Sequence, residues 1–193
     1  MNEQRTLTGH GLGFERRCWG WGTHPADFMF VGISAGRLGA LITQVPFTKD
    51  ASGRLLQRCL YRLGFSKSEE HSTIPEYQNC YVTNFVKGRC LTDSGLNRLP
   101  TKAEFEFWWP SIKKEVSEVH PKLILALGKI VYNELSIYLF PSTDKPMLKQ
   151  LKHPRYYQAH GALSNQKAFE KMVEEYRNVI QGIPTKTADK EDG

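Results

Sequence analysis

The sequence predicts a single-domain, three-layer α/β/α sandwich with a short and mostly parallel central sheet. Short apolar stretches with the profile of buried strands alternate with segments of helical spacing, which is the pattern of parallel α/β folds. The length of 193 residues suits one domain with a well-buried core. No internal repeat and no linker divides the chain. We therefore expect one domain over residues 1–181, with an irregular start over 1–17 and a disordered, charged tail over 182–193.

The composition indicates the cellular compartment of the protein and the kind of partner it binds. The chain has no apolar run of about eighteen residues, so we expect no membrane span, and no charged start is followed by an apolar segment as in secreted proteins. The four cysteines include no C-x-x-C pair, which is the usage of reduced intracellular thiols. We therefore expect a cytoplasmic protein. The formal net charge of +6 fits a partner made of phosphates, and the basic residues form no tail-like block.

The first strand and the first helix enclose a long loop. Residues 28–32 are apolar or small, as in a short buried strand, and helical spacing runs over 54–63 until Gly64 stops it. The loop between them is too long for an ordinary connection, because strand-to-helix loops usually take a handful of residues. It follows the carboxyl end of its strand, where ligands bind in open α/β sheets. This loop is therefore the first candidate for a binding site.

The later elements repeat the alternation of strand and helix. Thr101 and Glu104 have the spacing of a capping box and mark the start of a long helix. Pro121 and Gly128 bracket the third apolar stretch, and the last helix has a clear apolar face. In order, the predicted elements are a strand at 79–85, a helix from 101, a strand at 123–127, a helix at 129–138, a strand at 147–151 and a helix at 164–180.

Polar side chains follow three of the predicted strands. The loop from Ser34 to Asp50 follows the first strand, Asn84 ends the second, and His153 follows the last. Each has an ordinary alternative: a flexible loop with Ser52 as a helix cap, a turn asparagine and a turn histidine. Because parallel strands end at the same edge of a sheet, we expect the three to surround one crevice. The loop has the spacing of neither a dinucleotide-binding motif nor a P-loop.

The order and spacing of five motifs resemble the uracil-DNA glycosylase superfamily, most of all its family 4 and family 5 (type B) enzymes. The similarity extends over about residues 19–160. The motifs are the glycine-rich loop at 32–53, YVTNFVK at 81–87, PTKAE at 100–104 with the Trp-Pro pair that follows at 109–110, PKLILALG at 121–128 and HPRY at 153–156. The resemblance implies a uracil-DNA glycosylase-like fold. It also implies hydrolysis of an N-glycosidic bond in DNA, with the target nucleotide flipped out of the stack.

The chain departs from families 4 and 5 at the residues that bind their iron–sulfur cluster. The amino-terminal C-x-x-C pair is missing, Gly88 stands at the third cysteine position and Trp109 at the fourth. We therefore expect no metal and no cofactor. In the first motif, Ala35 replaces the usual proline and Ile33 the family 4 glutamate. Ser34 stands where other families have a catalytic Asp or Asn.

The resemblance assigns roles to residues at the three strand ends. Phe47 would lie against the base face, Asn84 would bind its Watson–Crick edge, and His153 would donate to the carbonyl oxygen of the departing base. Ser34 is too weak a base to act alone, which leaves Asp50 to position water and to balance the developing sugar cation. The other predicted site residues are Gly32, Ile33 and Gly36 at the base, and Lys49, Ser52, Lys87, Arg89, Lys152, Arg155, Tyr156 and Tyr157 on DNA, the last three in a loop expected to enter the minor groove.

The expected substrate is uracil or a 5-substituted or otherwise modified pyrimidine. Uracil-specific relatives have a bulky tyrosine where this chain has Gly36, and the glycine would admit larger groups at pyrimidine C5 unless Leu38 or Leu41 closes the space. We expect a monomeric DNA glycosylase acting on single- or double-stranded DNA, in base excision repair or in defence against phages with modified DNA. The alternative is a catalytically inactive, glycosylase-like DNA-binding module, which the changes in the first motif favour.

Overall fold

Five strands form the central sheet of the computed structural model, which describes residues 12–13, 17–36, 39–139 and 146–182. They are β2 (Trp21–Gly22), β3 (Phe28–Ser34), β4 (Cys80–Val86), β6 (Leu123–Leu127) and β7 (Met147–Leu151). The strand order is β2-β4-β3-β6-β7, and every neighbouring pair is parallel except β2 with β4 at one edge. All residues of β4 and β6 are buried, as expected where helices cover both faces of a parallel sheet.

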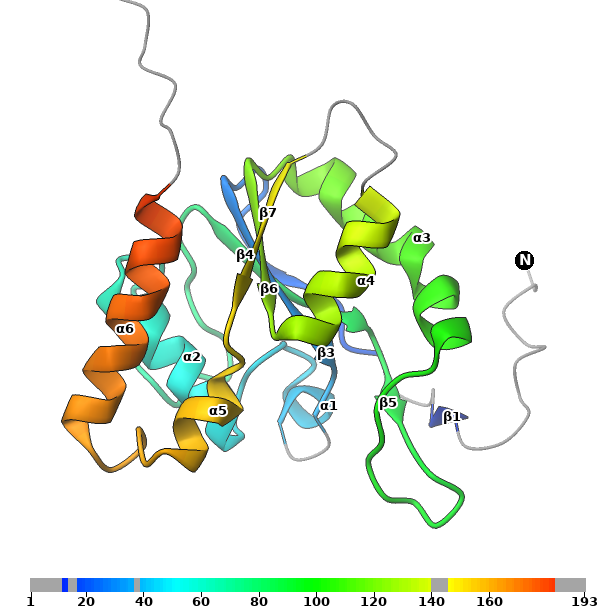
Figure 1. Cartoon of the computed structure of the whole chain (residues 1–193), viewed down its shortest axis with the longest axis horizontal. Coiled ribbons are helices and arrows are strands. Elements are labelled where there is room, and N and C mark those ends of the chain that lie inside the picture. The colour runs from blue at the N-terminus through cyan, green and yellow to red at the C-terminus, as the bar shows by residue number, and fades with distance from the viewer. Residues whose placement is uncertain (1–11, 14–16, 37–38, 140–145, 183–193) are drawn as a thin grey trace, which may run out of the picture.

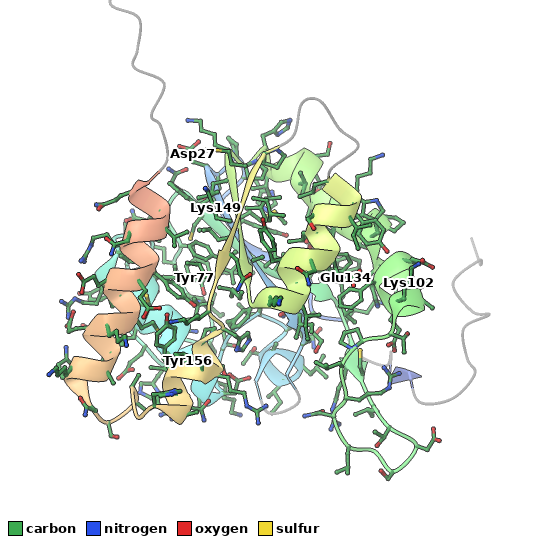
Figure 2. All side chains as sticks on the ribbon, viewed as in Figure 1. Asp27, Tyr77, Lys102, Glu134, Lys149 and Tyr156 are labelled. Carbon is green, nitrogen blue, oxygen red and sulfur yellow. The ribbon has the colours of Figure 1, made fainter. Side chains whose placement is uncertain are left out.

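Helices cover both faces of the sheet and give the predicted three layers (Figure 1). Alternate strand residues point to opposite faces: Phe30 and Leu125 pack with one helical layer, and Met29 and Ile124 with the other. Figure 2 shows the side chains that fill these layers, among them the buried Tyr77. The first layer consists of α2 (Ala51–Arg62), α5 (Pro154–Ala159) and α6 (Gln166–Gln181), and the second of α3 (Lys102–Val119) and α4 (Lys129–Leu139). This arrangement confirms the predicted fold class.

Helix α2 begins earlier than its apolar spacing predicts. The Asp50 carboxylate accepts a hydrogen bond of 2.7 Å from the Gly53 amide, which satisfies one of the free N–H groups of the first turn. Asp50 is therefore the cap of the helix, and the alternative in which Ser52 caps it is wrong. By contrast, the predicted capping box at the start of α3 is confirmed, with Thr101 and Glu104 bonded to each other's backbone amides.

Three segments expected to be irregular contain regular structure. The long loop after β3 includes a helical turn, α1 (Ala40–Thr43), and the segment after His153 is helix α5 rather than a loop. In the amino-terminal segment, β1 (Leu12–Gly13) pairs with β5 (Arg89–Cys90). The rest of the expected irregular start up to residue 16 and the expected tail from 183 lie outside the described residues. No helix in the described part of the chain is long and apolar enough to cross a membrane.

A buried ion pair joins the end of β4 to helix α3. Lys87 Nζ lies 2.6 Å from Glu115 Oε2 and donates to the Thr83 hydroxyl and the Asn84 carbonyl oxygen, each at 2.7 Å. The Lys87 side chain is fully buried. Burial lowers the pKa of its ammonium, while Glu115 opposes this change. Lys87 therefore has no access to a DNA phosphate, and its assignment to the DNA-binding set is wrong; it holds the backbone at Asn84 instead.

Replacing Lys87 by methionine should lower the free energy of unfolding by about 3–5 kcal/mol, because the Glu115 carboxylate would stay buried without its partner. Urea titration measures this loss, and Lys113→Met, at an exposed position of α3, is the control. The double variant Lys87→Met/Glu115→Gln should recover part of the loss. A loss below about 1 kcal/mol for Lys87→Met would contradict a charged pair in the interior.

Candidate active site

A cavity of about 470 Å³ is lined by residues that follow the carboxyl ends of β3, β4 and β7. Figure 1 shows α1, α5 and β5 at this same end of the sheet. The crevice predicted from the strand ends is thus a cavity, and its lining residues come from segments far apart in the sequence. The predicted site residues that line it are Ile33, Ser34, Gly36, Phe47, Asp50, Ser52, Asn84, Arg89, His153 and Arg155.

The carboxylate of Asp50 is fixed on one side and faces the cavity. Its Oδ1 accepts the Gly53 amide hydrogen bond that caps α2. Its Oδ2 lies where only glycine leaves room, since a Cβ added at Gly36 or Gly39 would come within 2.7 Å of this oxygen. Burial raises the pKa of the Asp50 carboxyl, against the lowering effect of the Gly53 and Ser52 amides. A partly desolvated carboxylate of fixed orientation can serve as a general base or can stabilise positive charge.

The segment before Asp50 holds the Phe47 ring against the cavity. Phe47 and Lys49 have left-handed backbone conformations, with φ of 53° and 65°, which are costly for residues other than glycine. Hydrogen bonds maintain them: Gln57 Nε2, on α2, donates to the Phe47 carbonyl oxygen at 3.1 Å, and the buried Thr48 hydroxyl donates to the Val45 carbonyl oxygen at 2.8 Å. The start of α2 therefore determines the position of the aromatic ring.

His153 lines the cavity with a neutral imidazole. It caps the start of α5, where its Nδ1 accepts a hydrogen bond of 3.1 Å from the Arg155 amide. Burial and the positive charge of Arg155 lower the pKa of the imidazole to about 4. Because Nδ1 acts as the acceptor, the proton of the neutral ring is on Nε2. The ring centroids of His153 and Phe47 are 6.0 Å apart, so a donor and an aromatic face lie side by side.

Asn84 contributes a side-chain amide from the end of β4. The residue is 2% exposed, and its backbone oxygen is held by Lys87. A Cβ at Gly32, on the neighbouring strand β3, would overlap Asn84 Oδ1 and the Phe47 ring, so the glycine lets both approach the strand. Among the described residues, no hydrogen bond engages the Asn84 amide group. The amide can therefore bind a ligand in the cavity with both a donor and an acceptor.

The residues predicted to contact DNA do not all lie at the cavity. Lys49 is exposed beside it. Lys152 and Tyr156 are exposed but outside the lining, with Lys152 Nζ 4.9 Å from the centre of the Tyr156 ring and 2.9 Å from Glu175 (Figure 2 labels Tyr156). Tyr157 is 3% exposed and donates a hydrogen bond of 2.6 Å to Glu175. It packs in the core against α2 and α6, so its assignment to the DNA-binding set is wrong.

Four residues that the sequence prediction omitted from the site also line the cavity. Ala40 belongs to the helical turn α1, and Gly95, Leu96 and Asn97 belong to the turn of a hairpin over residues 89–98. The hairpin lies between β4 and α3 in the chain. Its sequence offered a signal in the Asp-Ser-Gly turn at 93–95, but nothing in that signal indicates that the turn reaches the cavity.

The cysteines do not fit an iron–sulfur cluster. Cys59 and Cys80 are buried in one core cluster, Cys90 in a second and Cys18 in a third. In the described part of the chain no group of three or more His, Cys, Asp or Glu residues could hold a metal ion. At the fourth cysteine position, the Trp109 ring stacks on Tyr138 with centroids 4.9 Å apart. Aromatic packing thus occupies the place of a ligand.

Comparisons with known proteins confirm the resemblance. The sequence matches the family described as the uracil DNA glycosylase superfamily over residues 19–177. A type-5 uracil-DNA glycosylase of Pyrobaculum aerophilum is 31% identical over 115 residues, which are 58% of this chain and 49% of that protein, so the match spans about half of its length. The crystal structure of wild-type SMUG2 from Pedobacter heparinus has a similar fold, with a TM-score of 0.60 and 16% identity over 81% of this chain and 77% of that one.

Gly53→Ala should destabilise the protein, although alanine is about 1 kcal/mol better than glycine inside a helix. A Cβ at this position would come within 2.6 Å of the Phe47 carbonyl oxygen, so α2 and the Phe47 segment would have to separate. We expect a loss of about 1–3 kcal/mol in the free energy of unfolding, as for overpacked sites. Ser117→Ala, at an exposed position of α3, is the control and should be neutral or stabilising. A gain in stability for Gly53→Ala would refute this packing.

Proposed function

The chain belongs to the uracil-DNA glycosylase superfamily, and from this premise we propose that it is a monofunctional DNA glycosylase. It hydrolyses the N-glycosidic bond of a pyrimidine nucleotide that has been flipped out of DNA, and it leaves an abasic site. The observation that carries this proposal is that Asp50, Asn84, His153 and Phe47 line one cavity. Its volume of about 470 Å³ lies within the usual range of small-ligand sites, and a single nucleobase fits it.

The flipped base lies between an aromatic face and an amide. Its ring stacks on Phe47, and its Watson–Crick edge exchanges hydrogen bonds with the Asn84 amide. The buried Lys87 helps Asn84 to recognise the base, because it holds the Asn84 backbone in place. The Asn84 amide has no other hydrogen-bond partner among the described residues, so it breaks no protein hydrogen bond when it binds the base. A base with a non-matching edge would leave polar groups of the buried amide unpaired, which is costly.

Bond cleavage uses a donor on the base and a carboxylate on the sugar. His153 Nε2–H donates to a carbonyl oxygen of the base, which carries negative charge as the C1′–N bond breaks. Asp50 stabilises the developing positive charge on the sugar, orients a water and takes its proton as the new C1′–O bond forms. The Ser34 hydroxyl, at the end of β3, can hold the same water. The base departs as an anion and takes up a proton from solvent, and Asp50 releases the proton it took from water, so the products are the free base and an abasic site.

The substrate is uracil or a 5-substituted or modified pyrimidine. Gly36 lines the cavity and presents no side chain to pyrimidine C5. The same position is next to Asp50 Oδ2, so introducing a tyrosine there would displace the carboxylate as well as fill the pocket. Substitution at Gly36 therefore cannot separate substrate choice from catalysis, and a panel of bases must do so. Of the two residues considered for closing this space, Leu41 does not line the cavity and packs against Ala35 and Ala40. Leu38 lies outside the described residues.

Basic and polar groups at the cavity rim bind the DNA backbone. Ser52, Arg89 and Arg155 line the cavity, and the exposed Lys49 lies next to Asp50 in the chain. Such contacts fix the register of DNA without reading its sequence. The formal net charge of +6 favours this partner. We further propose a cytoplasmic monomer that acts in base excision repair or in defence against phages with modified DNA.

The experiment that tests the function is an incubation with a panel of end-labelled oligonucleotides, each carrying one altered pyrimidine, followed by alkaline cleavage at abasic sites. Both single-stranded and duplex forms are included. The proposal expects cleavage at uracil or at a 5-substituted pyrimidine. Binding without cleavage across the whole panel would support the inactive DNA-binding module instead, and the absence of both would remove DNA as the partner.

Asp50→Asn should reduce the rate of base release by about 10²- to 10⁴-fold, the usual contribution of a general base. The protein should unfold at the same or a higher temperature. The raised pKa of Asp50 means that its charged form is disfavoured in the fold, and asparagine can still cap α2. Single-turnover kinetics and thermal unfolding measure the two effects. A variant that keeps most of its activity would show that Asp50 is not the catalytic carboxylate.

The pH dependence should show an acid limb and no inflection near pH 6.5. Asp50 must be ionised to act, and its pKa is raised, so activity falls as the pH drops through a value above that of an ordinary carboxyl. His153, with a pKa of about 4, is neutral over the whole range above about pH 5 and remains a donor through Nε2. A single-turnover profile from pH 4.5 to 8.5 checks this. An inflection near 6.5 that disappears in His153→Gln would contradict a neutral His153.

A further inference from the structure

Helix α2 carries one polar side chain on its buried face. Its other buried residues are glycine or apolar, namely Gly53, Leu55, Leu56, Cys59 and Leu60. Gln57 is fully buried among them. An amide in an apolar interior is costly unless it is hydrogen-bonded, and a methionine or leucine would fill a similar volume. The amide of Gln57 therefore serves something other than packing.

The nitrogen of this amide joins two segments that are separate in the chain. Gln57 Nε2 donates to the Phe47 carbonyl oxygen at 3.1 Å and to the Ser72 carbonyl oxygen at 2.9 Å. Carbonyl oxygens only accept, so the group between them must supply two donors. Among uncharged side chains only the amides of asparagine and glutamine do so. The chemistry of the two partners thus determines the orientation of the Gln57 amide.

The oxygen of the same amide has no donor. Among the described residues no hydrogen bond reaches Gln57 Oε1, although the atom is buried. A buried acceptor without a donor is costly and uncommon. Turning the amide round would bring its oxygen against two carbonyl oxygens, which is worse. The fold therefore tolerates one unsatisfied atom in its interior and binds the carbonyl oxygens of Phe47 and Ser72 in return.

The bond to Phe47 affects the cavity. Phe47 has a φ of 53°, and a return to a negative φ would rotate its Cα–Cβ bond and move the ring away from the cavity wall. Helix α2 encloses the carbonyl group of this residue, because a Cβ at Gly53 would come within 2.6 Å of the oxygen and Gln57 binds it. Gln57 thus opposes relaxation of the backbone at Phe47.

The other end of the bridge is fixed as well. Ser72 belongs to the loop over residues 66–78, and the Trp21 indole donates to the Pro75 carbonyl oxygen of this loop at 2.9 Å. Trp21 lies in β2, at the edge of the sheet. The Gln57 amide is therefore held from the side away from Phe47 by a loop that is tied to the sheet.

We infer that Gln57 is a positioning residue for base recognition, which acts through Phe47 and touches neither the base nor the sugar. This inference rests on the proposed glycosylase function. Gln57 does not line the cavity, and its amide holds the Phe47 ring in the orientation in which a flipped base meets its face. A ring that is ordered before the base arrives lowers the cost of binding it.

Gln57→Met removes both donors and keeps a side chain that suits the interior. On the DNA of the panel that the wild type cleaves fastest, KM should rise by about 10-fold, within the range for loss of a base–aromatic stack. The kcat should change by less than about 3-fold, because the ring binds the base before and during bond cleavage. Leu60→Met, equally buried on α2, is the control and should match the wild type. An unchanged KM, or the same rise in Leu60→Met, would overturn the proposal.

A double-mutant cycle tests whether Gln57 acts through the aromatic ring. In a Phe47→Leu background, Gln57→Met should raise KM by less than a further factor of about 2, because no ring is left to position. A further rise as large as in the wild-type background would show that Gln57 affects the site by another route and would overturn the proposal.

A binding measurement does not require catalysis. Two duplexes of one sequence carry either 2′-fluoro-2′-deoxyuridine or a tetrahydrofuran abasic analogue, and concentrations are those of folded protein by circular dichroism. Gln57→Met should bind the first about 10-fold more weakly than the wild type does and the second less than about 2-fold more weakly, since the analogue has no base to stack. Gln57→Leu is the second variant, in case Gln57→Met does not fold.

Equal weakening on the two duplexes, or none on either, would overturn the role of Gln57. A wild type that releases no base from any DNA, while Gln57→Met shows the base-dependent loss of binding, would refute the glycosylase function and leave the role of Gln57 standing.

Discussion

The hydrogen bond from the Gly53 amide to the Asp50 carboxylate is the interaction on which the site depends. It begins helix α2 and at the same time fixes the orientation of the carboxylate at the cavity. Because α2 starts there, Gln57, about two turns further along the helix, reaches the Phe47 carbonyl oxygen and holds the aromatic ring in a backbone conformation that is otherwise unfavourable. The second carboxylate oxygen requires bare backbone at Gly36 and Gly39. One capping interaction therefore accounts for the glycines of the loop, the position of the aromatic ring and the orientation of the Asp50 carboxylate, which we propose to be catalytic.

The other polar residues of the site come from the carboxyl ends of the sheet strands. Parallel strands end at one edge, so Ser34, Asn84 and His153 meet there despite their separation in sequence. The ion pair of Lys87 with Glu115 is desolvated, and such pairs add little net stability compared with apolar packing. Lys87 also donates to the Asn84 carbonyl oxygen, so the main role of the pair is to hold the Asn84 backbone in position rather than to stabilise the fold. Burial likewise raises the pKa of Asp50 and lowers that of His153, so the charged form of each side chain is disfavoured in the folded protein. Such shifts are typical of functional sites.

Sequence patterns predicted the fold and the main side chains of the site, because buried strands, helical spacing and strand ends are local signals. They failed where burial depends on packing between distant segments. Lys87 and Tyr157 each lie two residues from a cavity residue in the chain, but each side chain turns into the interior, where Lys87 meets Glu115 of α3 and Tyr157 meets Glu175 of α6. The alternative that placed the cap of α2 at Ser52 is wrong, and the sequence could not exclude it because Ser52 and Asp50 are both good cap residues. The approach of Leu96 to the cavity depends on the Arg98–Glu104 pair, which no local pattern reveals.

The central claim is that a nucleotide flipped from DNA occupies the cavity between Phe47, Asn84 and Asp50. The most direct measurement is a crystal structure of the protein with a duplex carrying a 2′-fluoro pyrimidine nucleotide, which resists cleavage because fluorine disfavours positive charge on the sugar. The account predicts that the base ring lies on Phe47, that its edge meets the Asn84 amide and that C1′ faces the Asp50 carboxylate. A target base that remains stacked in the duplex, or DNA bound to a face away from this cavity, would contradict it.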